Sequence, residues 1–245
     1  MELSVVVPVR NEAGNLAPLL DEIVRILDGL CEYEIIYVDD GSTDTTLPTL
    51  TALLQSQPRL RVLRHRQGCG QSTALWTGIH AARGATIATL DGDGQNDPAD
   101  IPRLLEAWRG LQRENPKSMV AGHRKRRKDN GWRKISSRIA NAVRGCVLGD
   151  DTPDTGCGLK VFPRELFLLL PYFDHMHRFL PALVQRAGGK VVSVEVNHRP
   201  RLNGVSKYDT WQRLGMGIVD LLGVMWLQRR AKAAEVKEIY GRKFI

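Results

Sequence analysis

The chain has 245 residues, a net charge of +8 and a sequence pI near 9.5, a size that fits one α/β domain or one domain with an appendage. Its 42% hydrophobic and 25% charged residues are typical of a soluble globular protein and exclude a low-complexity chain. The four cysteines lack C-x-x-C spacing, so their pattern indicates neither a zinc site nor a disulfide framework, and we expect a reducing compartment. The positive charge predicts an anionic partner: nucleic acid, a phosphorylated substrate or an anionic membrane surface.

The sequence shows no sign of a targeting or membrane-spanning segment. It begins directly with a strand pattern and lacks the basic and then apolar stretches of a signal peptide. No run reaches about 18 apolar residues, the length that a spanning helix needs. We therefore expect the protein to reach any membrane from the cytoplasmic side, as a peripheral protein.

Strand and helix patterns alternate through the first hundred residues. Short apolar, β-branched runs predict strands at Leu3–Pro8, Glu34–Val38, Leu60–His65 and Thr86–Leu90. Helical periodicity covers about Leu16–Leu30 and a stretch that ends near Ala82. This alternation predicts a doubly wound, mostly parallel sheet, in which ligands bind beyond the carboxyl ends of the strands.

Carboxylates follow two of these strands where each one ends. Asp39 and Asp40 follow the second strand, and Asp91-Gly92-Asp93 follows the fourth. Unpaired and buried, such carboxylates would be costly, whereas a hard divalent cation takes oxygen ligands of this kind. Gln95 offers a further amide oxygen. The alternative for this triplet alone is a turn rich in Asp and Gly.

The other polar residues near these strand ends have more ordinary interpretations. Asp40 is expected to contact a ribose or base edge rather than to cap a helix, whereas Asp44 fits a helix cap. Asp97-Pro98 is typical of the cap and first turn of the next helix. Gly68-x-Gly70 lacks the third glycine of a dinucleotide-binding fingerprint and predicts a turn that allows close backbone approach.

Beyond a fifth predicted strand at Ser118–Gly122 the chain becomes strongly basic. This basic segment has three interpretations: a solvated basic face, a nucleic-acid-binding patch, or an anion site over a membrane. In the loop Asp151–Lys160, Asp154 either belongs to a plain turn, orients a cation or holds an acceptor. The cations of the basic segment are Arg124, Lys125, Arg126, Arg127, Lys128, Arg133, Lys134, Arg138 and Arg144.

The C-terminal part combines a closing strand with an amphipathic helix. Val191–Val196 alternates with period two, and His198–Lys207 places cations around a glycine turn suited to a phosphate. Trp211–Leu227 is apolar-rich and precedes a basic flank. It predicts a helix that lies in a membrane interface, docks on the domain or pairs with a second subunit. We therefore divide the chain into a catalytic domain, 1–210, and an amphipathic helical tail, 211–245.

Taken together, these motifs resemble the family 2 glycosyltransferases of the GT-A fold, and in particular the polyprenyl-phosphate hexosyltransferases typified by dolichyl-phosphate mannosyltransferase. V-D-D-G-S followed by D-x-D-x-Q is specific to the superfamily, and R-K-I-S-S with R-x-x-G-x-S-K narrows the resemblance to lipid-phosphate acceptors. The resemblance covers roughly residues 1–210. The motifs are V-V-V-P-V-R-N-E at the start, Val38–Ser42, Gly70–Ser72, Asp91–Gln95, Trp132–Ser137, Asp154–Gly156 and Arg201–Lys207.

The resemblance implies a role for each matching residue. Those implied to bind the nucleotide sugar are Pro8, Arg10, Glu12, Val38, Asp40, Asp91, Gly92 and Asp93. Those implied to hold Mg²⁺ or Mn²⁺ are Asp91, Asp93 and Gln95. Those implied to bind the acceptor phosphate are Arg124, Arg133, Ser137, Arg201 and Lys207, with Asp91, Asp93 and Arg133 as the catalytic group.

The sequence departs from the archetype at two places. Arg10 stands where the mannosyltransferases often have an aromatic residue, so the contact with the base is expected to differ. The segment His175–Leu180 lacks the archetype's carboxylate and is more similar to bacterial polyprenyl-phosphate glucosyl- or aminoarabinosyl-type transferases. The donor is therefore GDP-mannose or a UDP-hexose.

The implied reaction is an inverting transfer of a hexose from a nucleoside-diphosphate sugar to a polyprenyl phosphate. Because that phosphate is already ionised, positioning and charge neutralisation replace a strong general base. Expected partners are these two substrates, a membrane surface, and an anchoring partner or a second copy of the chain. Two other functions remain as alternatives. A GT-A enzyme with a soluble or glycan acceptor would place a carboxylate base at the acceptor side, and a nucleic-acid-binding protein would leave the carboxylate clusters unexplained.

Overall fold

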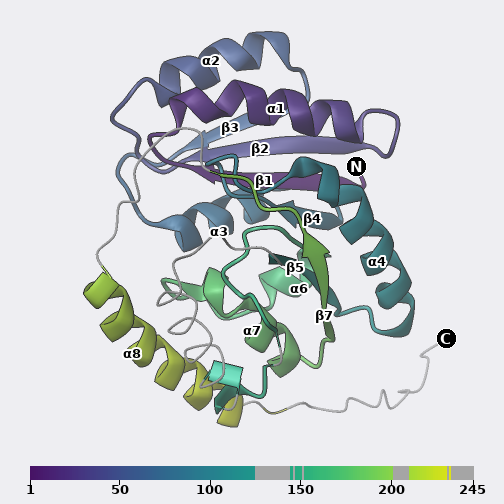
Figure 1. Ribbon diagram of the computed structural model, residues 1–245, viewed down its shortest axis with the longest axis vertical. Coiled ribbons are helices and arrows are strands. Elements are labelled where there is room, and N and C mark those ends of the chain that lie inside the picture. The colour runs from purple at the N-terminus through teal and green to yellow at the C-terminus, as the bar shows by residue number, and fades with distance from the viewer. Residues whose placement is uncertain (125–143, 146, 151, 201–209, 231, 233–245) are drawn as a thin grey trace, which may run out of the picture.

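The structure is a computed structural model, and it describes residues 1–124, 144–145, 147–150, 152–200, 210–230 and 232. A seven-stranded sheet forms its centre, with strand order β3-β2-β1-β4-β6-β5-β7 and helices on both faces (Figure 1). β1, β2, β3 and β4 are parallel to one another, whereas β6 is antiparallel to both β4 and β5. The predicted doubly wound, mostly parallel α/β fold is confirmed.

The first half of the chain contains the parallel strands, and all four predicted strands are present. Helix α1 begins earlier than predicted, at Ala13, and ends at Leu27 because Gly29 turns the chain with a left-handed φ of 78°. The elements are β1 (Leu3–Val9), α1 (Ala13–Leu27), β2 (Tyr33–Asp39), α2 (Thr46–Ser56), β3 (Leu60–Arg64), α3 (Gln71–Ala81) and β4 (Thr86–Thr89).

The second half completes the sheet and adds short helices. Asp97 caps the 3-10 turn η1 through its carboxylate, which accepts the N–H of Ala99, as Asp97-Pro98 predicted. The elements are η1 (Pro98–Asp100), α4 (Ile101–Glu114), β5 (Met119–Arg124), β6 (Lys160–Pro163), α6 (Arg164–Leu168), η2 (Met176–Arg178), α7 (Leu180–Arg186), β7 (Val191–Val196) and α8 (Thr210–Arg229). Strand β6 was not predicted, because it has only four residues and two of them, the lysine and the proline at its ends, do not fit an apolar strand pattern.

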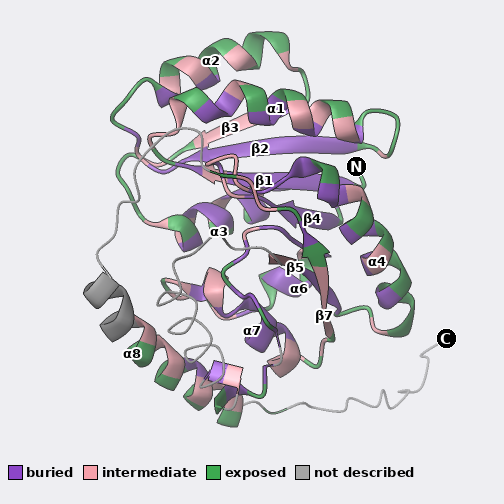
Figure 2. Ribbon diagram, in the orientation of Figure 1, coloured by how far each residue is buried: buried purple, intermediate pink, exposed green. Residues whose placement is uncertain are grey.

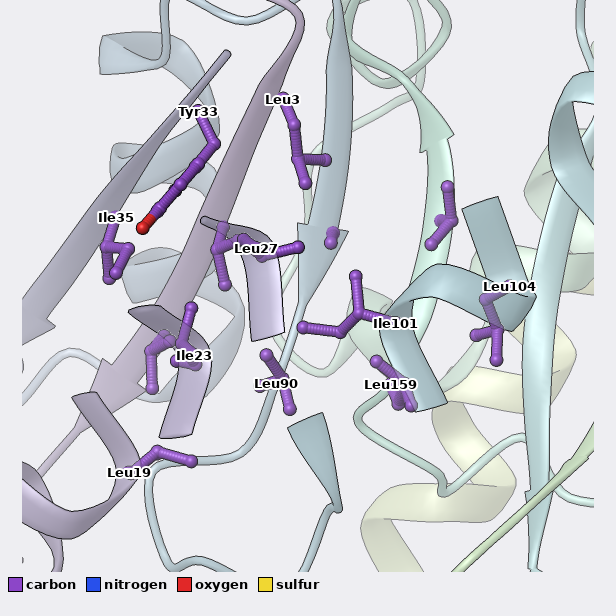
Figure 3. Close-up of a cluster of buried hydrophobic side chains, with 14 of the residues drawn as sticks. Leu3, Leu19, Ile23, Leu27, Tyr33, Ile35, Leu90, Ile101, Leu104 and Leu159 are labelled. Atoms are coloured by element: carbon purple, nitrogen blue, oxygen red, sulfur yellow. The ribbon is translucent and has the colours of Figure 1, made fainter. Parts of the chain in front are cut away.

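Two hydrophobic clusters hold the helices to the two faces of the sheet. Alternate residues of β1 point to opposite faces, as the pleat of a strand requires. Leu3, Val5 and Val7 join α1 and α4 in the first cluster, where Figure 3 shows Ile23, Leu27 and Ile101 meeting the strands. Val6 faces the second cluster with α3, α6 and α7. Burial of both faces keeps the strand ends fixed relative to one another.

Helix α8 lies along the outside of the second cluster (Figure 1). Val224 is 1% exposed and packs with Leu221 and Met225 on the domain, whereas the opposite side of the helix is largely exposed (Figure 2). His175, whose φ is 63°, places Nδ1 3.1 Å from Asp220 Oδ2. One face of the helix therefore packs on the domain, which is one of the three placements considered from the sequence. Among the helices that the structure describes, none combines the length and apolar character needed to cross a bilayer.

Candidate active site

The polar segments predicted to bind a ligand meet at the carboxyl ends of β1, β2 and β4. The backbone N–H of Asp40 donates to the carbonyl oxygen of Val9, 2.9 Å away. A Cβ added at Gly92 would lie 2.8 Å from the carbonyl oxygen of Pro8, so only glycine allows this approach. Three predicted nucleotide-binding residues, Pro8, Asp40 and Gly92, are thus brought to one edge of the sheet.

Asp40 holds the loop that leads into α3. Its Oδ1 accepts the N–H of Cys69 at 2.7 Å and lies 2.8 Å from Nδ1 of His65, while its Oδ2 accepts the N–H of Gly70 at 2.9 Å. Burial alone would raise the pKa of Asp40, but the hydrogen bonds from Cys69, His65 and Gly70 outweigh it and hold the pKa below its ordinary value. The carboxylate is therefore ionised and well satisfied. Asp44 accepts the N–H of Thr46, the first residue of α2, at 2.9 Å, although Thr45 occupies the N-cap position itself.

Asp91 is in the opposite situation. Burial and then repulsion from Asp93 raise its pKa to about 6, although Lys160, Arg124 and a hydrogen bond from Gln71 act in the other direction. That hydrogen bond joins Gln71 Nε2 to Asp91 Oδ1 at 2.8 Å. A Cβ added at Gly158 would overlap the Asp91 carboxyl group, so the carboxyl group packs directly on the glycine backbone. The fold therefore positions Asp91 tightly while leaving its charge under-compensated.

The residues at the end of β4 fit a divalent cation. Asp91 and Asp93 repel each other, and a cation between carboxylates relieves such repulsion. Asp93 Oδ1 accepts the N–H of Gln95 at 3.1 Å, which folds the turn back on itself. The side-chain amide of Gln95 donates to the carbonyl of Arg199 at 3.5 Å, which directs its nitrogen there and leaves its oxygen as the candidate ligand. The set consists of oxygen donors, which suits Mg²⁺ or Mn²⁺.

The other residues predicted to bind the nucleotide differ in their surroundings. Arg10 is exposed and its guanidinium lies against Gly68, where any Cβ would overlap it. Glu12 precedes α1 and accepts a hydrogen bond from Asn15 Nδ2 at 2.7 Å. Val38 is fully buried in the second cluster, so its side chain has a packing role in this structure.

Among the residues predicted to bind the acceptor phosphate, the structure describes Arg124. Its guanidinium forms a bidentate ion pair with Asp154, with Nε–Oδ2 at 2.6 Å and Nη2–Oδ1 at 2.8 Å. Of the interpretations of Asp154, orientation of a cation is the one that the structure confirms. Both side chains are largely buried, so Arg124 is fixed in place beside the site. Arg133, Ser137, Arg201 and Lys207 lie outside the described residues.

The loop that carries Asp154 is held by two further buried cations. Arg144 donates to Thr155 Oγ1 and to the carbonyl of Thr152, the latter at 2.8 Å. Lys160 donates to the carbonyls of Thr155 and Cys157, and burial lowers its pKa. The charge of Lys160 lies near Asp91 and acts to lower the pKa of that carboxyl group.

Sequence reasoning did not assign several of these side chains. Gln71 was part of a motif, but its contact with Asp91 was not predicted, and its position directly after Gly70 at the start of α3 was the available signal. Ser72 and His177 were also missed, although Ser72 Oγ lies 2.7 Å from His177 Nδ1. Burial lowers the pKa of His177 well below its ordinary value, so this imidazole is neutral at pH 7.

Solved structures share this fold at low sequence identity. Mannosyl-3-phosphoglycerate synthase from Rubrobacter xylanophilus superposes with a TM-score of 0.67 at 19% identity, over 97% of this chain and 77% of that one. Glucosyl-3-phosphoglycerate synthase from Mycobacterium tuberculosis, in complex with Mn²⁺, UDP-glucose and phosphoglyceric acid, gives 0.64 at 20% identity, over 95% and 81%. The GT-A fold is thereby confirmed.

Curated relatives are more similar in sequence. Dodecaprenyl-phosphate galacturonate synthase of Rhizobium johnstonii is 38% identical over 94% of this chain and 68% of its own length. Undecaprenyl-phosphate 4-deoxy-4-formamido-L-arabinose transferase of Aeromonas hydrophila is 33% identical over 91% and 65%. This chain therefore spans about two thirds of the length of these relatives. Glycosyl transferase family 2 matches residues 4–170, and the chain is an enzyme that belongs to this family.

Proposed function

We propose that the protein transfers a sugar from a nucleoside-diphosphate sugar to a polyprenyl phosphate, with inversion at the anomeric carbon. The observation that carries the proposal is the paired carboxylates Asp91 and Asp93 beside the ordered Asp40 loop. The relatives named for polyprenyl-phosphate sugar transfer support this lipid as the acceptor. They also favour a uronic acid or an amino-pentose derivative as the sugar over mannose.

On the donor side, the loop between β3 and α3 positions the nucleotide. Asp40 fixes this loop through the amides of Cys69 and Gly70, and the loop in turn approaches Arg10 at Gly68. The base and ribose would bind between the ends of β1 and β2, within reach of Pro8 and Asp40. Preorganisation of this kind removes the ordering cost of the loop from the binding step.

The diphosphate would lie over the end of β4. Asp91, Asp93 and Gln95 would hold the divalent cation, which, when bound, supplies Lewis-acid stabilisation of the departing nucleoside diphosphate. Gln71 and Gly158 keep the Asp91 carboxyl group in one orientation. Lys160 and Arg124 add positive charge behind it. These groups are in place before the substrate arrives, which is the requirement for electrostatic stabilisation.

On the acceptor side, the reaction needs an ionised phosphate oxygen rather than a strong base. A bond forms between that oxygen and the anomeric carbon while the bond from this carbon to the β-phosphate oxygen breaks. Arg124, held by Asp154, and the predicted Arg133, Ser137, Arg201 and Lys207 would bring the second anion to the sugar against repulsion from the donor.

Transfer of labelled sugar into solvent-extractable lipid tests this function. Purified protein is mixed with a polyprenyl phosphate, Mg²⁺ or Mn²⁺, and in turn UDP-galacturonate, a UDP-amino-arabinose, UDP-glucose, UDP-N-acetylglucosamine or GDP-mannose. We expect label in the lipid phase with one donor, lost on addition of EDTA and in Asp93→Ala. Release of free nucleotide without label in lipid would contradict the lipid acceptor and favour a soluble or glycan acceptor.

We also propose that α8 rests on the membrane that holds the acceptor. Its outward side exposes large apolar side chains, with Val219 70% exposed, and its C-terminal end carries Arg229 and Arg230. An apolar face with a basic flank is the pattern of a helix in a bilayer interface. The exposed apolar residues are Ile218, Val219, Leu222 and Trp226.

Flotation with vesicles tests the role of α8. Wild-type protein should float with vesicles that contain anionic lipid, and Val219→Glu with Leu222→Glu should reduce the bound fraction at least several-fold. Leu54→Glu, which alters an exposed leucine on α2, is the matched control and should float like wild type. Unchanged flotation of the double variant, or its loss of a dimer without loss of flotation, would assign the face to a protein partner instead.

A further inference from the structure

We propose that Asp40, His65 and Cys69 form a second cation site, selective for a transition metal such as Zn²⁺ and distinct from the oxygen-lined site of Asp91 and Asp93. The three side chains each offer one ligand atom, and these atoms lie within 4.8 Å of one another. They comprise a carboxylate oxygen, an imidazole nitrogen and a thiol sulfur. Nitrogen and sulfur donors favour zinc over magnesium, whereas the site at the end of β4 offers oxygen donors.

The topology of the sheet brings the three ligands together. β2 and β3 are adjacent and parallel, with Asp39 opposite Arg64, so Asp40 and His65 each follow directly at the end of its strand. The N–H of His65 donates to the carbonyl of Asp39 at 2.8 Å and fixes this register. Cys69 follows in the loop that Asp40 anchors. Sequence spacing gave no indication of this site because its ligands come from two strand ends and a loop.

The distances match a zinc site after small side-chain movements. Bonds of about 2.0–2.3 Å in a tetrahedral site place ligand atoms roughly 3.3–3.8 Å apart. Asp40 Oδ1 and His65 Nδ1 are now 2.8 Å apart and would separate slightly around an ion. The Cys69 thiol donates to the carbonyl of Gln67 at 3.3 Å, and it is exposed, so it can turn toward the ion from solvent. Water would fill the fourth position.

The second nitrogen of His65 already has the partner that a metal-binding histidine needs. His65 Nε2 lies 2.9 Å from Thr77 Oγ1, on the first turns of α3. This hydrogen bond holds the ring in the plane that directs Nδ1 at Asp40. Such outer partners fix the tautomer and orientation of metal-binding histidines, and their loss typically weakens metal binding about 10–100-fold.

Occupation of this site would inhibit the enzyme, and this consequence rests on the proposed function. An ion on Asp40 Oδ1 would draw the carboxylate away from the nucleotide and would compete with the N–H of Cys69 that orders the loop. Zinc should therefore compete with the nucleotide sugar while Mg²⁺ or Mn²⁺ remains bound at Asp91 and Asp93.

Cobalt substitution tests the site without any assay of transfer. Co²⁺ bound by a thiolate gives a sulfur-to-metal charge-transfer band in the near ultraviolet. We expect this band at one equivalent of Co²⁺ in the presence of excess Mg²⁺, and its loss when Zn²⁺ is added. Cys69→Ser should abolish the band and weaken Co²⁺ binding about tenfold or more, and His65→Gln should weaken binding to a similar degree.

Cys31→Ser is the matched control, because Cys31 is a partly exposed cysteine elsewhere in the fold. It should keep the charge-transfer band at full intensity. A band that survives in Cys69→Ser, or that disappears in Cys31→Ser, would overturn the assignment. So would wild-type protein that shows no thiolate band at micromolar Co²⁺. Circular dichroism of each variant verifies that its fold is retained.

Inhibition then tests the consequence separately. Micromolar Zn²⁺ should raise the KM for the nucleotide sugar in wild type and in Cys31→Ser, and should affect Cys69→Ser at least tenfold more weakly. A thiolate band without inhibition would keep the metal site and reject its overlap with the donor. Absence of any transfer activity would instead count against the proposed function, since the cobalt spectrum does not depend on it.

Discussion

β2 and β4 pair with β1 on its two sides. An aspartate follows each of these two strands, and the surroundings shift the pKa values of the two aspartates in opposite directions. Asp40, at the end of β2, has two backbone amides and His65 as partners, and its pKa is lowered. Asp91, beyond β4, has one side-chain hydrogen bond from Gln71 and the charge of Asp93 nearby, and its pKa is raised to about 6. Both carboxylates come from the same kind of strand-end sequence, yet only at Asp40 do the surrounding groups favour the ionised form.

This difference separates a carboxylate whose charge already has its partners in the protein from one whose charge is left uncompensated. A carboxylate that accepts several amides organises the loop around it and contributes to stability. A carboxylate that lies beside another and is under-compensated lowers stability until a cation binds, and groups with such perturbed pKa values cluster at functional sites. The stability of the protein should therefore respond in opposite ways to mutation of the two carboxylates and to pH.

Replacement of Asp91 by Asn should have the largest effect on activity. Because the variant removes a charge that we propose holds the metal, we expect kcat/KM to fall about 10³-fold or more in the lipid-transfer assay. At about 100 times the Kd, Mg²⁺ should stabilise wild type by about 2.7 kcal/mol in thermal unfolding, and should stabilise Asp91→Asn far less. Near-wild-type turnover in the variant would remove Asp91 from the metal site.

The pH dependence of metal-free protein sharpens the same comparison. The folded-state pKa of Asp91, about 6, exceeds its unfolded value of 3.8, so its favourable contribution is full below pH 3.8 and is lost as the pH rises through 6. Asp91→Asn should therefore unfold at a higher temperature than wild type at pH 8, with the difference shrinking toward pH 4. An equal difference at both pH values would contradict the raised pKa.

Gly158→Ala should have the next largest effect. The new methyl group would overlap the Asp91 carboxyl group and displace it, and a misplacement of about 1 Å can lower activity about 10²-fold. Gly110→Ala, in the interior of α4 with open space around it, is the matched control and should retain full activity. Single-turnover kinetics with saturating donor would locate the loss in the chemical step, whereas a fall in activity from both variants would indicate a general effect on the fold.

Asp40→Asn should act first on stability. The amide oxygen can replace only part of the three interactions, so an unsatisfied partner should cost about 1–3 kcal/mol in urea unfolding. Because the folded pKa of Asp40 is lowered, its contribution is present above the unfolded value and is lost as the pH falls through the folded value. Wild type and variant should therefore converge in stability under strongly acidic conditions, below about pH 4. A difference in unfolding free energy that stays constant with pH would mean that the variant loses stability through altered packing and not through the lost charge.

The sequence was informative where local chemistry alone determines the outcome. Alternating strands and helices predicted the sheet, and Asp91-Gly92-Asp93 after an apolar run predicted a strand-end site because side chains there emerge at the sheet edge. The sequence could not show that the pKa of Asp40 is lowered whereas that of Asp91 is raised. That distinction depends on contacts that form only through tertiary packing. The partners of Asp40 lie 25 to 30 residues away, at His65, Cys69 and Gly70. Gln71 and Gly158, which contact Asp91, lie 20 and 67 residues from it.

Gln71→Ala should have the smallest effect of the series and the most specific one. The variant removes the hydrogen bond that favours ionised Asp91, so the pKa of Asp91 should rise further and the acid limb of kcat/KM should move to higher pH. At pH 7 we expect a loss of about tenfold, reduced at pH 8.5, since a hydrogen bond to a charged group contributes about 1.5–3 kcal/mol. Gln55→Ala, an exposed glutamine on α2, should leave the profile unchanged. An equal loss at every pH would mean that Gln71 contacts the substrate directly, and an unchanged profile would mean that Gly158 and the nearby cations suffice to hold Asp91 ready for the metal.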